Sequence, residues 1–116
     1  MFQDMYRLNR PRPDIVFRRS GQIDIRLEAS RRMCLTPGSR VSFFLDGEGD
    51  LYVRRDADGL RPVEMGGKHS FRFHCKQVTD AVLGLPDVPC GLDRAAFRIG
   101  QPDDGANFPV ITRRLL

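Results

Sequence analysis

Residues 22–28 (QIDIRLE) are the stretch that decides the fold class of this chain. Ile23, Ile25 and Leu27 alternate with Asp24 and Arg26. Successive side chains of a strand point to opposite sides, so this period of two is typical of a β-strand with one buried face. We therefore expect a strand here, with its isoleucines in the core.

A second alternating stretch covers residues 69–76 (HSFRFHCK). Phe71, Phe73 and Cys75 share one face, and polar or charged residues occupy the other. The two stretches are separated by an offset of 48 residues. The pattern predicts a second half-buried strand.

Each alternating stretch is followed by a short segment with helical spacing. In residues 29–35 (ASRRMCL) and 77–83 (QVTDAVL), apolar or small residues recur at i, i+3 and i+4. The predicted buried faces are Ser30, Met33 and Cys34 in the first helix, and Val78, Ala81 and Val82 in the second. Arg31 and Arg32 are expected to project into solvent.

Further strands are predicted at residues 14–19, 41–45, 51–55, 94–99 and 108–113. The acidic, Gly-rich residues 46–50 form a hairpin loop between two of them. Pro109 lacks the backbone N–H that a central strand needs, so the last strand is expected at a sheet edge or with a bulge.

The length of 116 residues matches one average domain, so residues 1–116 are interpreted as a single domain. It divides into an extended arm (1–13), a first half (14–55), a linker (56–68) and a second half (69–113). Both halves have the order strand, helix, strand, strand. The predicted fold is therefore mainly β: a small barrel of two pseudo-repeated strand–helix–hairpin units with two short helices. The alternative is an ordinary β-rich chain without a repeat.

Composition indicates a cytoplasmic protein. The three cysteines are an odd number at irregular spacing, and the charged N-terminus has no apolar export signal. No apolar run approaches the roughly 20 residues of a membrane helix, so no membrane association is expected.

No pattern indicates an enzyme, a cofactor or a metal site. The acids at residues 46–50 and 103–104 are typical of turns. His69, His74, Cys75 and Cys90 are the candidate zinc ligands, but His74 and Cys75 are neighbours on a strand and point to opposite faces. We predict that the chain has no catalytic residues and no metal.

Arginine dominates the basic residues of the first half. Nine arginines and three acids lie between Arg7 and Arg40, and the whole chain carries a net charge of +4. Arginine suits phosphate recognition because its planar guanidinium can form paired hydrogen bonds. The alternative is a solvated basic surface that reflects a GC-rich genome.

The first half resembles the AbrB-like family (SpoVT/AbrB, with the MazE-type antitoxins) of swapped-hairpin proteins. The resemblance covers residues 17–55, about a third of the chain: the turn at Ser20-Gly21, the alternating strand, a short helix, the T-P-G turn at residues 36–38 and a closing hairpin. It implies a barrel of two interleaved copies that binds DNA through arginines. In this chain the second half can supply the second copy.

The arginine-rich first half predicts a DNA-binding set at Arg18, Arg19, Arg26, Arg31 and Arg32, of which Arg31 is the position that matches the family. The sequence departs from the family at Gln22, where a basic residue is usual, and at Arg26, where proline is usual. Two functions stay open: a DNA-binding regulator that contacts double-stranded DNA, and a module that binds a protein partner without nucleic acid. Two assemblies also stay open, a monomeric pseudo-dimer and a homodimer.

Overall fold

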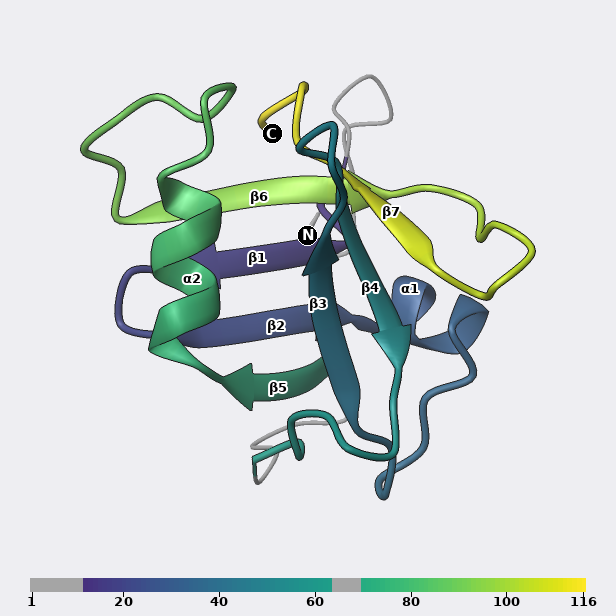
Figure 1. Cartoon of the computed structure of the whole chain (residues 1–116). Coiled ribbons are helices and arrows are strands. Elements are labelled where there is room, and N and C mark those ends of the chain that lie inside the picture. Colours follow the sequence, from purple (N-terminus) through teal and green to yellow (C-terminus); the bar gives the residue numbers. More distant parts are fainter. Residues whose placement is uncertain (1–11, 64–69) are drawn as a thin grey trace, which may run out of the picture.

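The computed structural model describes residues 12–63 and 70–116, and within them the chain is mainly β (Figure 1). Residues 1–11 of the expected arm and 64–69 of the expected linker lie outside the described ranges. The strands are β1 (Ile15–Arg18), β2 (Gln22–Arg26), β3 (Val41–Leu45), β4 (Leu51–Arg55), β5 (Ser70–His74), β6 (Arg94–Ile99) and β7 (Phe108–Ile111). The helices are α1 (Leu27–Arg32) and α2 (Lys76–Leu83). None of the helices in these ranges is long and apolar enough to cross a membrane.

The strands form one curled antiparallel sheet in the order β3-β4-β7-β6-β1-β2-β5. β6 joins its two parts, because its first residues pair with β1 and its last residues pair with β7. As a result, β3 and β4 cross over the layer made by β6, β1 and β2 (Figure 1). Helix α2 lies beside β3 on the same side of that layer.

A short segment links the two edge strands of the sheet. Leu60 and Val41 exchange backbone hydrogen bonds of 2.7 and 3.1 Å, which attaches the segment to β3. Three residues later, the N–H of Val63 donates to the carbonyl of Arg72 in β5 at 2.8 Å. These bonds partly close the curled sheet, so the fold is barrel-like, as the sequence predicts at the coarse level.

The core lies between the crossed parts of the sheet. Ile23, Ile25 and Phe73 are fully buried, which confirms the two predicted alternating faces. Phe17 is also fully buried, and its ring packs against Phe43 with the ring centroids 5.7 Å apart. Aromatic and aliphatic burial from both parts therefore holds the crossed layers together.

The predicted strand ends are slightly too long, because the helices begin earlier than expected. Residues 27 and 28 belong to α1, and β2 ends at Arg26. In the same way β5 ends at His74, and α2 starts at Lys76. The end of β1 moves from residue 19 to Arg18, and that of β7 from residue 113 to Ile111.

The predicted buried face of the first helix is wrong at Cys34, which is exposed. α1 ends at Arg32, and Cys34 adopts a left-handed backbone with φ of 56°. The N–H of Leu35 donates to the carbonyl of Ser30, which completes the hydrogen-bond pattern of a helix that closes on a left-handed residue. Met33 is buried as predicted.

The predicted face of the second helix is also wrong in part. The buried residues of α2 are Thr79, Val82 and Leu83. Val78 is half-buried and packs against the margin of the core, and Ala81 is exposed. The helix therefore presents part of its apolar side to solvent.

Pro109 does not place its strand at an edge. β7 lies between β4 and β6, and Pro109 is paired with Tyr52. The carbonyl of Pro109 accepts from the N–H of Gly100, just after β6 ends. The ring nitrogen thus faces the end of β6, where no ladder bond is required, so the proline is tolerated inside the sheet.

Candidate nucleic-acid interface

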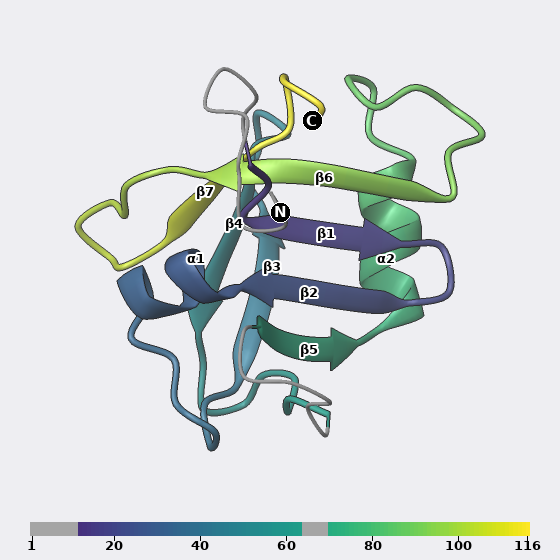
Figure 2. The same ribbon diagram turned by 180° about the vertical axis from the view of Figure 1, so that it is seen from behind.

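Five arginines from four adjacent strands share the outer face of the β6-β1-β2-β5 layer. In each strand the alternate residues face the core, as Phe17, Ile23 and Phe97 do, so the residues between them lie on the opposite face. The middle of that face is covered, since Val16 and Ala96 are buried. We call this set the arginine face; it consists of Arg18, Arg26, Arg72, Arg94 and Arg98. Figure 2 looks onto this side of the layer, with α2 behind the strands.

Two of these arginines are direct cross-strand neighbours. Arg18 in β1 is paired with Arg94 in β6. Like charges directly opposite each other on two strands destabilise a sheet. Neither side chain has a hydrogen bond or ion pair with a residue in the described ranges. Their repulsion would be relieved by an anion bound between them.

Two carboxylates neutralise part of the arginine face. Asp24 accepts from Arg72 at 2.8 Å and from the amide of Gln22 at 3.0 Å. Asp14 accepts from Arg98 at 3.0 Å. These contacts hold Arg72 and Arg98 in place at the cost of part of their charge.

The remaining arginines of the face are electrostatically uncompensated. Arg18, Arg26 and Arg94 have no carboxylate partner among residues 12–63 and 70–116. Arg26 and Arg94 are exposed, and Arg18 is half-buried. The face therefore carries an excess of positive charge available to an external anion.

The structure separates the five arginines that the sequence predicts as one DNA-binding set. Arg18 and Arg26 lie on the arginine face, but at opposite ends of the β1–β2 hairpin. Arg19 is in the turn between these strands, where it donates to the carbonyl of Leu92 and lies 3.3 Å from Asp93. Arg19 is thus already engaged in a surface contact.

Helix α1 carries the other two predicted residues, and they differ in role. Arg31 is exposed, as expected. The expectation that Arg32 projects freely into solvent is wrong, because its guanidinium donates at 3.0 Å to Asp14 and to the carbonyl of Ile99. Arg32 is held by these two contacts, which tie α1 to the sheet.

Three arginines of the face come from the second half and were not in the predicted set. Arg72 alternates with Phe71 and Phe73, and Arg94 and Arg98 occupy the outward positions of the RAAFRI strand. The alternation alone predicts that they face outward. Their proximity to Arg18 and Arg26 follows from strand order, which the sequence does not contain.

The candidate zinc ligands do not gather in the described ranges, and His69 lies outside them. His74 is exposed and its Nε2 is 3.1 Å from the carbonyl of Ser20, while Cys75 packs against the core. Cys90 is an exposed loop residue. In the described part of the chain, His74, Cys75 and Cys90 therefore do not form a ligand set.

An acidic group does form in the hairpin loop between β3 and β4. The carboxylates of Asp46, Glu48 and Asp50 lie within 4.8 Å of one another. The Oδ1 atom of Asp46 accepts from the N–H groups of Glu48 and Asp50, each at 2.9 Å. These hydrogen bonds are those of a turn, in agreement with the interpretation from sequence.

Comparisons of the chain with protein-family models, with curated proteins and with solved structures find no significant match. Its function therefore has to be inferred from the placement of its own residues.

Proposed function

We propose that the chain binds double-stranded DNA through the arginine face. The supporting observation is that Arg18, Arg26 and Arg94 share one face and lack carboxylate partners in the described chain. Arginines that neutralise phosphates release condensed counterions, which drives association without sequence recognition. Binding of this kind agrees with the net charge of +4.

The dimensions of the face suit a backbone contact. Strands lie about 4.8 Å apart, and the four residue steps of β6 from Arg94 to Arg98 span roughly 13 Å. Duplex DNA carries one charge per about 1.7 Å of its axis, so several phosphates fit across this area. Three uncompensated arginines correspond to a slope of about −2.7 for the logarithm of affinity against the logarithm of salt concentration.

The test is fluorescence anisotropy with a mixed-sequence duplex at several salt concentrations. In the double variant Arg18→Ala and Arg94→Ala, two phosphate contacts are lost, so the salt slope should become shallower by about 1.8. The matched control removes the same charge elsewhere, with Arg40→Ala just before β3 and Arg55→Ala at the end of β4. The salt slope of DNA binding should be nearly unchanged in the control variant.

Two results would overturn the proposal. The wild-type chain could show no salt-sensitive binding to duplex DNA. Alternatively, both double variants could weaken binding equally, which would indicate a diffuse effect of net charge. Retention of folding in each variant is checked by circular dichroism.

We also propose that the chain is an AbrB-like pseudo-dimer, with 14–55 and 69–113 as two copies of one unit. The pairing of β2 with β5 supports a local two-fold relation. An offset of 48 residues replaces Ile23 by Phe71 and Phe73 by Ile25, and Phe71 and Ile25 are themselves paired. Exchanging the two strands therefore leaves the register unchanged. The centre of this pairing is Asp24 opposite Arg72.

The pairing of β4 with β7 is also symmetric, but at an offset of 57 residues, which the loop residues between β5 and β7 lengthen. These strands pair antiparallel about Tyr52 and Pro109, with Leu51 opposite Val110 and Val53 opposite Phe108. An experimental structure tests the proposal by superposition of the two halves. The repeat is refuted if β2, α1, β3 and β4 do not superpose on β5, α2, β6 and β7 in that order.

A further inference from the structure

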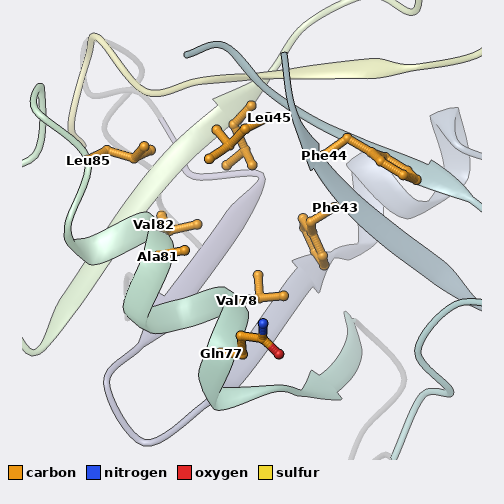
Figure 3. Close-up of a pocket in the computed structure, with 9 residues that line it drawn as sticks. Phe43, Phe44, Leu45, Gln77, Val78, Ala81, Val82 and Leu85 are labelled. Carbon is orange, nitrogen blue, oxygen red and sulfur yellow. The ribbon is translucent and has the colours of Figure 1, made fainter. Parts of the chain in front are cut away.

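An apolar groove runs between β3 and α2, on the opposite side of the layer from the arginine face (Figure 3). Phe43, Phe44 and Leu45 of β3 and Leu51 of β4 form one wall. Gln77, Val78, Ala81 and Val82 of α2, with Leu85, form the other. The volume of about 220 Å³ is below the roughly 300–1,000 Å³ of sites that enclose small ligands. The groove therefore suits a few side chains of a larger partner.

The wall on the β3 side includes an unpaired strand edge. β3 is the last strand of the sheet order, and it pairs only with β4 and with Leu60 in the described chain. Val41 directs both its N–H and its carbonyl to Leu60. Since these groups alternate along a strand, those of Phe43 and Leu45 point to the same free edge.

Large apolar side chains are exposed along this edge. Phe44 is 38% exposed and Leu45 is 50% exposed, and Ala81 of α2 is exposed on the other wall. An open edge with apolar side chains is a template for an additional strand. The segment at Leu60 already uses the same edge antiparallel to β3, and an incoming strand would continue its line.

The end of the groove at Leu45 is acidic. Asp46 directly follows Leu45, and Glu48 is exposed in the same loop. Asp87, also exposed, lies two residues after Leu85 on the other wall. A partner segment that runs antiparallel to β3 places its N-terminal end here, so basic residues at that end would complement the groove.

We propose that this groove binds an extended segment of a partner protein, added antiparallel to β3, with basic residues followed by alternating apolar residues. Main-chain hydrogen bonds to Phe43 and Leu45 supply affinity, and the apolar walls supply specificity. The proposal is independent of DNA binding, and the two surfaces can be occupied together.

The probe is the fluorescein-labelled peptide KRVSVSV, titrated into the full chain by anisotropy. Saturable binding is expected. Ala81→Glu places a carboxylate in the groove at a position that is exposed in the free protein, so the chain should fold and lose binding by about tenfold or more. The matched control Ala57→Glu adds the same charge in an exposed loop, and Arg18→Ala with Arg94→Ala tests independence from DNA; both should bind normally.

Charge at the acidic end is tested separately. Glu48→Lys should weaken binding of KRVSVSV by about threefold, since exposed charge pairs contribute little. The charge-reversed peptide EDVSVSV should bind the wild-type chain more weakly than KRVSVSV. An equal affinity for both peptides would refute the basic end of the partner.

Strand addition itself is tested by backbone modification. One peptide is N-methylated on its valines and a second on its serines. Because alternate N–H groups of an added strand point to β3, only one of the two peptides should lose affinity, by about tenfold or more. Hydrogen exchange of the backbone N–H groups of Phe43 and Leu45 should slow in the complex. The N–H groups of Ser42 and Phe44 point toward β4, so their exchange should not change and provides the internal control.

Three outcomes would overturn the proposal. Equal effects of both methylation patterns would mean that no strand is added. Absence of peptide binding, with a dimer by sedimentation that Ala81→Glu dissociates, would assign the groove to a second copy. Unchanged peptide binding by Ala81→Glu would place the peptide elsewhere.

Discussion

Replacement of Asp14 by alanine should destabilise the fold more than loss of any surface ion pair. Its side chain is 5% exposed, and its Oδ2 atom accepts three hydrogen bonds. The donors are the N–H of Ile99 at 2.8 Å, Arg32 at 3.0 Å and Arg98 at 3.0 Å. One carboxylate thus joins the start of β1, helix α1 and the end of β6.

The expected loss is about 3 kcal/mol in the free energy of unfolding. Ile99 is 3% exposed, and a buried N–H without a partner costs about 1–3 kcal/mol. Arg32 and Arg98 are 28% and 45% exposed, so they regain water and each ion pair contributes only about 0.5 kcal/mol. The backbone bonds of Asp14 to Phe97 and Arg26 are retained in the variant.

Urea unfolding followed by circular dichroism measures this loss, and Asp93→Ala is the control. Asp93 also pairs with an arginine, Arg19, but its side chain is 91% exposed, so its loss should cost about 0.5 kcal/mol or less. Asp14→Asn keeps an acceptor for Ile99 and should fall between the two. Equal stability of the Asp14→Ala and Asp93→Ala variants would refute the reasoning.

Three further outcomes are expected. Gly59→Ala should destabilise by about 2 kcal/mol in urea unfolding, because a Cβ there would lie 2.4 Å from the carbonyl oxygen of Val41; no change would mean that the edge segment is easily displaced. Cys34→Gly should raise stability by about 0.5 kcal/mol, since glycine adopts the left-handed backbone without strain, while Cys34→Ser should be neutral. The N–H and side chain of Asn107 lower the pKa of Asp103, and the N–H of Asp58 and the hydroxyl of Ser42 lower that of Asp56. Both contributions are present above the ordinary pKa of about 3.9 and disappear as the pH falls through the folded pKa, so stability should decline on acidification, and less so in Asp103→Asn.

Local pattern was enough to predict the elements themselves. Period-two alternation located β2 and β5, and turn residues located the hairpin of β3 and β4. These features depend on neighbours in the chain, so the sequence contains them directly. The end of the first helix was predicted wrongly, because the left-handed backbone that follows α1 falls on Cys34, a residue that carries no sequence signal for it.

Only the tertiary structure decided which surfaces exist. Arg18 and Arg94 are 76 positions apart, and strand order alone makes them neighbours. Val78 and Ala81 have the spacing of a core face, yet Val78 is only half-buried and Ala81 is exposed, so the same pattern lines an open groove. Sequence spacing therefore determined the strands and their buried faces, because side-chain direction is set locally. The arginine face and the groove depend on which strands pair and where the sheet stops, and long-range packing decides both.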